Sequence, residues 1–360
     1  MFIVLVIPPD ARQTSIIPGT ALFLACTCYD CGMGDLGKGF IIVDPEDRAI
    51  QPTIMVNGDA MDIVIPAGAQ YRHPIRMVVR KAMRMKVDVG ERARVILIED
   101  LRISPLQPSF TSSPSPQPSP TALRLGSGQA AGEGDVAIHS MEVFLKSGAD
   151  VEFISQQFAD PSAHLTITQR SHVGDHATIR WKNITLGARQ VEHDLLSEIT
   201  GANAVSAIDW MFYAKGDEKY QLSARNVFSG RHGGGEITMK GVAEEKGHVR
   251  CNGKIEIGSG GGQTDTYLTQ DILMLDKTSK VDAIPGLEIK TNDVKASHSA
   301  TVSRVTDDDL FYFAARGIRE REARRMFVHG FLGELVAKTE SSSVREEILD
   351  AIREKNERKK

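Results

Sequence analysis

A glycine followed by alternating apolar residues recurs along this chain, and this repeat limits its fold more than any other feature. Such segments follow Gly90, Gly148, Gly174 and Gly201, and the last three glycines are 26 and 27 residues apart. An alternation with a period of two is typical of β-strands that bury one face. The spacing fits one coil of a β-solenoid, in which each strand stacks on the equivalent strand of the previous coil.

The same pattern continues toward the C-terminus. One predicted strand alternates apolar and polar residues, and its apolar set is Val249, Cys251, Gly253, Ile255 and Ile257. Cys251 is therefore expected to point into the core. A later strand contains Val281, Ala283, Leu287 and Ile289, and is interrupted by Pro285 and Gly286. Because proline cannot donate a ladder hydrogen bond, this strand is expected at a bend or an edge.

The residues after Thr306 predict helices instead of strands. Asp307, Asp308 and Asp309 fill a first turn, where the helix dipole favours carboxylates, and Gly317 ends that helix. A second helix is expected from about Glu320. A third is expected from Ser343, with Glu346 completing a capping box and with an apolar stripe of Val344, Ile348 and Ile352.

These patterns divide the chain into three parts. Residues 1–60 are expected to be an irregular N-terminal segment, residues 61–305 a β-helix core, and residues 306–360 a helical domain. Within the core, residues 105–134 are rich in proline, serine and glycine. Such a composition cannot bury enough apolar surface to offset its ordering entropy, so a flexible insertion is predicted there.

Bulk composition excludes several classes of function. The formal net charge is -4, so no basic surface for nucleic acid is indicated. No apolar run approaches the roughly 18 residues that a membrane-spanning helix needs. The protein is therefore expected to be cytoplasmic, with neither nucleic acid nor a membrane among its partners.

The cysteines allow two interpretations. Of four cysteines, Cys26, Cys28 and Cys31 lie close together near the N-terminus and Cys251 stands alone. This is not the density of a secreted disulfide scaffold. The N-terminal three could hold zinc or an iron–sulfur cluster, but no fourth ligand follows nearby, and the alternative is unpaired thiols in an irregular segment.

One segment carries a resemblance to a known family. Its motifs are Pro285-Gly286-Leu287-Glu288-Ile289, Asp293-Val294-Lys295, Ser297-His298-Ser299-Ala300-Thr301, Leu310-Phe311-Tyr312 and Arg316-Gly317-Ile318. In order and spacing they resemble the SufB/SufD family of iron–sulfur cluster assembly scaffolds, with weaker likeness back to about Pro66. The resemblance implies a mainly β fold, a right-handed parallel β-helix (solenoid) with a C-terminal helical domain.

The resemblance also implies a function and partners. A family scaffold receives iron and sulfide from an iron source and a sulfur donor, carries a transient iron–sulfur cluster and is not itself an enzyme. A SufC-like ABC ATPase would dock on the C-terminal helices and drive opening of the subunit interface. The single histidine motif is most similar to the minimal, SmsB-like system with one scaffold type, which implies a homodimer; a SufB/SufD-type heterodimer is the alternative.

Four residues are candidates for holding the cluster. His298 matches the family's ligand-like histidine at the subunit interface; the alternative is a hydrogen-bonded histidine at a strand-to-helix junction. Family scaffolds often carry a cysteine about 28 residues earlier, where this chain has Gln270 and Asp271. Asp271 could bind iron through oxygen or be an exposed loop residue. Cys251 could accept sulfur or pack in the core, and Glu288 is a nearby carboxylate whose expected role is mainly structural.

The helical tail offers candidate partner-binding residues: Phe311, Tyr312, Arg316, Phe327 and Phe331. The aromatic residues could fill a groove of the ATPase or pack the short helices against one another, and both are expected in some measure. The glycine clusters lack the Lys-Ser/Thr of a phosphate loop, so no nucleotide site is expected in this chain. A carbohydrate-binding or carbohydrate-active β-helix is the alternative function, although the charges are scattered.

Overall fold

The computed structural model describes residues 52–57, 59–103, 136–339 and 341–358. It also describes the backbone of three short strands, β1 (Ile3–Val6), β2 (Thr14–Ser15) and β3 (Gly39–Val43). The predicted insertion at 105–134 and the three N-terminal cysteines lie outside the described residues. Strands β1, β2, β3 and β4 (Thr53–Asn57) all fall within residues 1–60, the segment that the sequence marked as irregular.

The described strands form two sheets of ten strands each. We call the first sheet A, and its order is β1-β3-β6-β8-β10-β12-β14-β16-β18-β20. Pairing is antiparallel from β1 to β6 and parallel from β6 onward. The parallel strands are β6 (Ile75–Val79), β8 (Arg94–Leu101), β10 (Asp150–Gln157), β12 (Thr178–Thr185), β14 (Val205–Ala214), β16 (Gly234–Ala243), β18 (Thr264–Met274) and β20 (Val294–Arg304).

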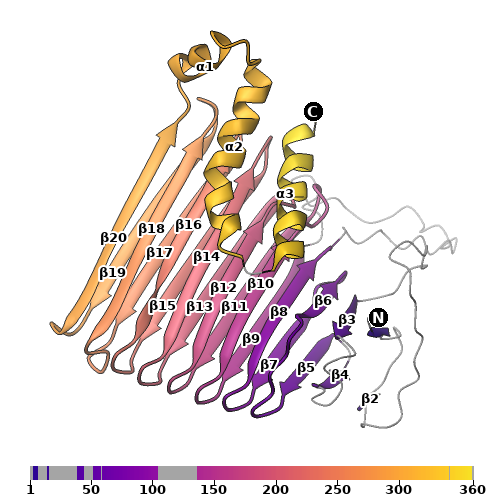
Figure 1. Cartoon of the computed structure of the whole chain (residues 1–360), viewed down its shortest axis with the longest axis vertical. Helices are drawn as coiled ribbons and strands as arrows, with labels where there is room; N and C mark the ends of the chain where they lie inside the picture. The colour runs from indigo at the N-terminus through magenta and orange to yellow at the C-terminus, as the bar shows by residue number, and fades with distance from the viewer. Residues whose placement is uncertain are drawn as a thin grey trace, which may run out of the picture.

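The second sheet, sheet B, has the order β19-β17-β15-β13-β11-β9-β7-β5-β4-β2. Its strands pair in parallel from β5 to β19. They are β5 (Ala60–Ile65), β7 (Arg84–Val89), β9 (Val136–Leu145), β11 (His164–Val173), β13 (Gln190–Ile199), β15 (Lys219–Phe228), β17 (His248–Ile257) and β19 (Lys280–Ile289). Successive strands alternate between the two sheets, so each coil of the solenoid adds one strand to each (Figure 1).

The predicted parallel β-solenoid is therefore confirmed. Inward-facing side chains of both sheets form one apolar core along the solenoid, and the alternation read from the sequence gives their phase. Phe153 lies beside Trp181, and Trp181 beside Ile208, on successive strands of sheet A. Strand β19 runs through Pro285 without a break, and it is the last described strand of sheet B, as expected for a strand that contains proline.

Stacked glycines form one corner of the coils. A Cβ atom built on Gly201 would lie 2.1 Å from the carbonyl carbon of Gly174, and one on Gly230 would lie 2.2 Å from the carbonyl oxygen of Gly201. No side chain fits at these distances without moving the backbone of the neighbouring coil. The recurring glycines are thus a steric requirement of coil stacking.

Three helices follow the solenoid: α1 (Asp307–Ala314), α2 (Glu320–Ala337) and α3 (Ser342–Glu357). Thr306 and Asp309 form a capping box at the start of α1. The sequence placed the start of α3 at Ser343, but the cap is Ser341, whose hydroxyl accepts a hydrogen bond from the Val344 amide. The predicted stripe is correct, because Val344, Ile348 and Ile352 are fully buried.

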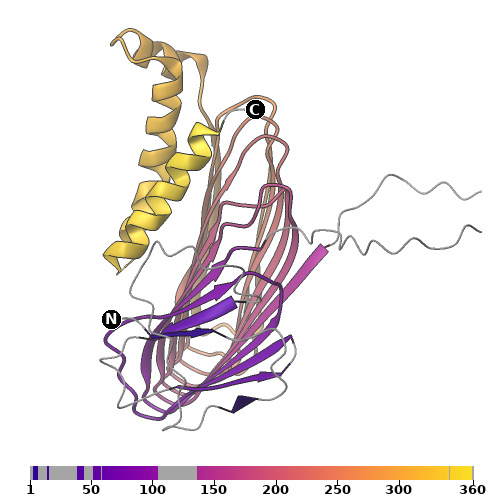
Figure 2. The same ribbon diagram turned by 90° about the vertical axis from the view of Figure 1, so that its right-hand side faces the viewer.

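Helices α2 and α3 cover part of the outer face of sheet A (Figures 1 and 2). A second apolar core lies between them; it includes Ile154, Ile184, Met211 and Val242 from the sheet, and Val328, Leu332, Leu335, Val344, Ile348 and Ile352 from the helices. We call α1, α2 and α3 together the helical unit. No helix in the described ranges is long and apolar enough to cross a membrane.

Lysines of the solenoid bind the C-terminal ends of both packed helices. Lys182 Nζ donates to the carbonyl oxygen of Lys338 at 2.6 Å, directly after α2. Lys215 Nζ donates to the carbonyl oxygen of Asn356 at 2.9 Å, in the last turn of α3. Cations at these positions stabilise a helix because they satisfy its free carbonyls and oppose the negative end of its dipole.

A buried lysine ties α3 to the turns of the solenoid. Lys355 Nζ lies 2.6 Å from Glu218 Oε2, 2.7 Å from the Leu186 carbonyl oxygen and 3.0 Å from the Tyr220 hydroxyl. Burial lowers the pKa of Lys355 to about 8, against the opposing effect of the Glu218 carboxylate. The attachment of α3 therefore contains a group that titrates close to neutral pH.

The substitution Gly201→Ala is expected to destabilise the solenoid. The new methyl group would overlap the Gly174 backbone, and overpacking of this kind costs roughly 1–3 kcal/mol or more. Urea denaturation measures the loss. Gly333→Ala in α2 is the control, because its Cβ would meet no atom within 4 Å and is expected to stabilise the helix by about 0.5–1 kcal/mol. Equal stability of the Gly201→Ala variant and the wild type would contradict the stacking model.

Raising the pH is expected to strengthen the folded state through Lys355. The folded chain releases the Lys355 proton at a pKa of about 8, whereas the unfolded chain keeps it up to its ordinary pKa of 10.5. Between these values the unfolded state binds more protons, so stability rises with pH. Relative to Lys355→Met, the free energy of unfolding of the wild type should rise by on the order of 1–3 kcal/mol between about pH 7.5 and pH 10, as measured by urea denaturation. A wild-type-to-variant difference that does not change with pH would refute this assignment.

Candidate functional site

The solenoid ends in two strands that have a free edge. Strand β20 is the last of sheet A and β19 the last of sheet B, and neither has a further neighbour among the described strands. We call this part the open end; it lies at the left of Figure 1. Three of its apolar side chains are exposed, namely Ile284, Ile289 and Val302. Free strand edges with exposed apolar groups are typical sites of pairing with another chain.

His298 lies at the open end on the interior side of sheet A. Its neighbour in the adjacent strand β18 is Leu268, which is fully buried in the solenoid core. Two other residues of β20 with the same phase, Val294 and Ala296, pack against that core. Because no coil covers it among the described residues, His298 is nevertheless exposed. The histidine is therefore in the middle of the last strand, and not at the junction with α1.

Gln270 and Cys251 lie inside the last coils. Gln270 Nε2 donates across the interior to the Cys251 carbonyl oxygen at 3.3 Å and lies 3.7 Å from Met239 Sδ. Gln270 Oε1 is buried and has no hydrogen-bond partner among the described residues. Gly253 makes room for this amide, since a Cβ there would lie 3.0 Å from Gln270 Nε2 and 2.7 Å from Leu268 Cδ1.

Cys251 has the properties of a packing residue. Its side chain is completely buried between Leu222 and Ala283 on the neighbouring strands. Burial raises the pKa of the Cys251 thiol well above its ordinary value. Since the thiolate is the reactive form, this cysteine is a poor sulfur acceptor in the described conformation.

Asp271 lies on the opposite face of sheet A from His298. It follows the inward-facing Gln270 and points toward α2, where Lys240 Nζ lies 3.4 Å from its Oδ2 atom. The same ammonium group lies 2.7 Å from Glu334 Oε2 and 4.5 Å from the centre of the Phe331 ring. Asp271 is thus a strand residue that helps to link α2 to β18, and it does not converge with His298.

Glu288 is on the outer face of sheet B. Its carboxylate lies 2.9 Å from Lys254 Nζ and 3.0 Å from Lys290 Nζ. The hydrogen bonds from these two lysines lower the pKa of Glu288. Its side chain lies on the far side of the sheet from the interior where His298 points.

The structure therefore does not bring the four predicted cluster residues together within one chain. Across the described parts of the chain, no three side chains of His, Cys, Asp or Glu are placed to hold a metal ion. Among the described residues, His298 is the one predicted cluster residue that is exposed on the interior side of the open end.

The helical unit separates the predicted partner-binding residues into two groups. Phe311 and Tyr312 are 73% and 55% exposed on α1, which buries none of its residues. The Arg316 guanidinium stacks 3.4 Å from the centre of the Tyr312 ring. Phe327 and Phe331 instead pack against the core below the helices, and Phe327 contacts Phe313 edge to face. The first three residues are exposed at the tip of the helical unit, whereas Phe327 and Phe331 are half-buried.

Comparison with known proteins shows which family this fold and its open end belong to. Residues 123–331, which begin before β9, end within α2 and include the whole open end, match the family model described as "SUF system FeS cluster assembly, SufBD core domain". The chain belongs to the SufBD family.

Individual relatives of this SufBD protein are distant. The iron–sulfur cluster assembly protein SufD of Escherichia coli is 26% identical over 206 residues, which cover 57% of this chain and 49% of SufD. A SufBD family protein of Mycobacterium bovis is 28% identical over 198 residues, covering 54% of this chain and 23% of the relative. A SufBD family protein from Mycobacterium tuberculosis is 29% identical over 205 residues, which cover 54% of this chain and 51% of the relative. The chain thus spans about half or less of the length of these relatives.

The SufBD fold also encloses a polar cluster that the sequence analysis missed. The buried Glu99 carboxylate lies 2.9 Å from His139 Nε2, 2.7 Å from Ser155 Oγ and 3.2 Å from Gln169 Nε2. The Met83 amide donates to His139 Nδ1, so the proton of this ring is on Nε2 and faces Glu99. These donors satisfy a charge that would otherwise be costly inside the core.

The alternation of inward and outward residues along the strands could have revealed the buried polar residues that the sequence analysis missed. Glu99 alternates with Leu97 and Leu101, which places it inside, and Gln270 alternates with Leu268 and Ile272 in the same way. Both polar residues interrupt an apolar stripe. Such an interruption marks a buried polar group that needs partners.

Proposed function

We propose that this SufBD protein is a scaffold subunit on which an iron–sulfur cluster is assembled at the open end of the solenoid. The observation that supports this most directly is His298, an exposed imidazole on the interior side of the last strand. Imidazole is a common ligand for iron, and an exposed imidazole can be reached by it. Iron and sulfide are the substrates of this scaffold, and the cluster is transient cargo.

A homodimer joined at the open end would complete the ligand set. Strands β19 and β20 have free edges, and Ile284, Ile289 and Val302 would be covered by a second chain. Two His298 side chains would then approach each other across the interface. Pairing of edge strands supplies backbone hydrogen bonds without new side chains, which suits an interface that has to open again.

Sulfur is proposed to come from a separate donor. Cys251 is buried and its thiol resists ionisation, so it does not serve as the acceptor in this conformation. Sulfide or a donor-bound sulfur would enter between the two chains at the open end. Cys251 and Gln270 then shape the inner wall of the site, while Asp271 and Glu288 stabilise the strands from outside.

A SufC-like ABC ATPase is proposed to dock on α1. Phe311, Tyr312 and Arg316 form an exposed aromatic and cationic surface at the tip of the helical unit. Movement of α2 would reach the open end through Lys240, which links Glu334 of α2 to Asp271 of β18, the strand next to β20. The ATPase supplies the energy and the scaffold supplies the site. Family membership favours this role over a carbohydrate-active β-helix.

His298→Ala is expected to lose most of the visible absorbance that the wild type gains when it is reconstituted with ferrous iron and sulfide without oxygen. The reason is the loss of the exposed imidazole at the interface. Absorbance spectra and iron content measure the effect, and light scattering on the wild type should give the mass of two chains.

His248→Ala is the matched control, since His248 is a half-exposed histidine on the outer face of sheet B. It should bind iron and sulfide like the wild type. Equal reconstitution of the His298→Ala and His248→Ala proteins would refute the proposed site, provided that both variants keep the circular dichroism of the wild type.

Replacing Phe311 and Tyr312 together by alanine is expected to abolish co-purification with an ABC-type ATPase. Exposed aromatic anchors carry much of the binding energy of an interface, so affinity should fall at least about tenfold. Pull-down and surface plasmon resonance measure this loss. Tyr267→Ala, which removes an exposed aromatic ring from β18, is the control and should bind normally. Unchanged binding of the double variant would move the docking site away from α1.

A further inference from the structure

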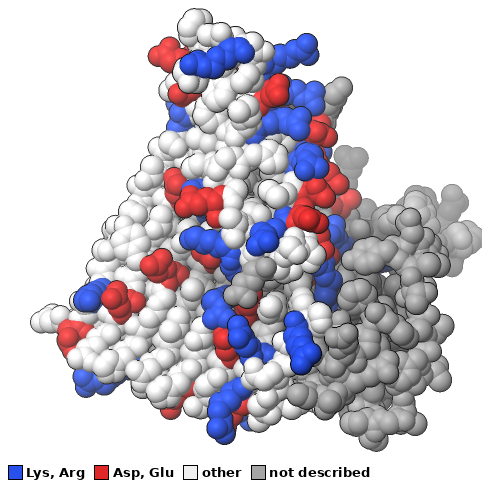
Figure 3. All heavy atoms as spheres, viewed as in Figure 1, with Lys and Arg blue, Asp and Glu red and all other residues white. Residues whose placement is uncertain are grey.

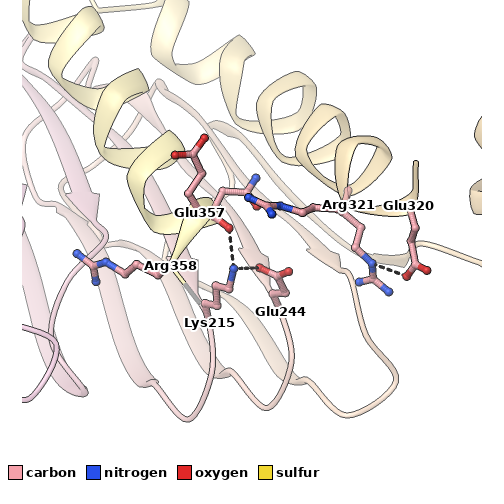
Figure 4. A pocket seen from close by; sticks show the side chains of 8 residues that line it. Lys215, Glu244, Glu320, Arg321, Glu357 and Arg358 are labelled. Atoms are coloured by element: carbon pink, nitrogen blue, oxygen red, sulfur yellow. Dashed lines mark hydrogen bonds and ion pairs between the residues drawn. The ribbon is translucent and has the colours of Figure 1, made fainter. Parts of the chain in front are cut away.

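We propose that the seam between the helical unit and the solenoid contains a binding site for a small phosphate-type anion such as pyrophosphate. A pocket of about 470 Å³ lies there, formed by turns of the solenoid, the start of α2 and the end of α3 (Figure 4). Its lining residues are all polar or charged: Lys215, Glu244, Glu320, Arg321, Arg324, Asn356, Glu357 and Arg358. Because every lining side chain carries a hydrogen-bonding or charged group, the pocket suits a small charged ligand.

The carboxylates of the pocket are already engaged. Glu244 accepts a very short hydrogen bond from the Tyr213 hydroxyl, and Lys215 Nζ lies 3.4 Å from its Oε2 atom. Glu320 accepts from Arg324 Nε at 2.9 Å. Glu357 Oε1 lies 3.4 Å from Arg325. The acidic side chains are thus neutralised by fixed partners and leave little acceptor capacity for a cationic ligand.

The groups left without partners are hydrogen-bond donors. Arg321 has no ion pair or side-chain hydrogen bond with any described residue, and Figure 4 shows it extending from α2 toward Glu357 at the end of α3. The Asn356 Nδ2 atom is buried and has no acceptor among the described residues. Arg358 extends away from Arg321 in the same view. The buried Asn356 Nδ2 atom requires an acceptor, and the exposed Arg321 guanidinium offers donors and positive charge, so the expected ligand is rich in oxygen and negatively charged.

The positive charges come from separate elements. Lys215 belongs to the turn between β14 and β15, and Arg321 and Arg324 belong to the first turns of α2. A guanidinium group offers a planar set of donors that matches phosphate oxygens in a bidentate way. A diphosphate has acceptor oxygens at both of its ends, which suits a pocket whose donors come from separate elements.

The surface around the pocket also carries many charged side chains. In Figure 3, acidic and basic side chains are interspersed over the helices and along their border with the sheet. An anion bound between Arg321, Lys215 and Asn356 would connect α2, the solenoid and α3 at one point. Binding to the folded state alone would raise the stability of the helical unit on the solenoid. This site is independent of cluster assembly at the open end.

Titration calorimetry of the whole chain with pyrophosphate tests the proposal, with orthophosphate and ADP as further ligands. We expect saturable one-to-one binding of pyrophosphate. Arg321→Gln and Asn356→Asp should each weaken it about tenfold or more, because each removes a donor to a charged ligand. Arg353→Gln in α3, whose partner is Asp350, is the control and should bind like the wild type.

The ligands also separate two sources of the phosphate group. ADP binding no tighter than pyrophosphate indicates a free oxyanion, whereas tighter ADP binding indicates the phosphates of a nucleotide. The proposal is overturned if the wild type binds no pyrophosphate at millimolar concentration, or if Arg321→Gln and Asn356→Asp both bind it like the wild type. The proposal would also be overturned if chloride at equal ionic strength displaced the bound pyrophosphate.

Discussion

In-register stacking of parallel coils is the constraint on which the rest of this structure depends. Every inward side chain lies over its equivalent in the previous coil, so the core continues from one coil to the next without a gap. The same constraint demands glycine at the Gly174–Gly201–Gly230 corner. In the described part of the chain the stack ends at β19 and β20, and the outer edge of each of these two strands has no partner strand.

The proposed chemistry follows from that ending. His298 is exposed only because its position on the interior side belongs to the last strand; one coil earlier, the equivalent Leu268 is completely buried. The open end therefore combines an imidazole, apolar side chains and free strand edges in one surface. A second chain that covers this end would bury the apolar side chains and pair the free strand edges.

The helical unit is attached by both apolar packing and charge. Its apolar core gives most of the contact with sheet A, while Lys182, Lys215 and Lys355 bind carbonyls at helix ends or turns of the solenoid. Buried ion pairs gain less stability than apolar packing of the same size, because their desolvation is costly. Their value lies in fixed positions, and Lys240 in particular connects α2 to the strand beside β20.

The sequence by itself determined the solenoid strands, their inward phase, the three helices and the family, because these depend on local alternation, caps and motifs; it did not predict the strands within residues 1–60. It also placed Cys251 correctly inside. It did not show that Asp271 and His298 face opposite sides of one sheet, although Gln270 and not Asp271 shares the inward phase. Which aromatic residues of the tail are exposed, that Glu99 has buried partners and that α3 closes a charged pocket were decided only by the tertiary structure. These features join residues far apart in the chain, and local patterns carry no information about which distant groups meet.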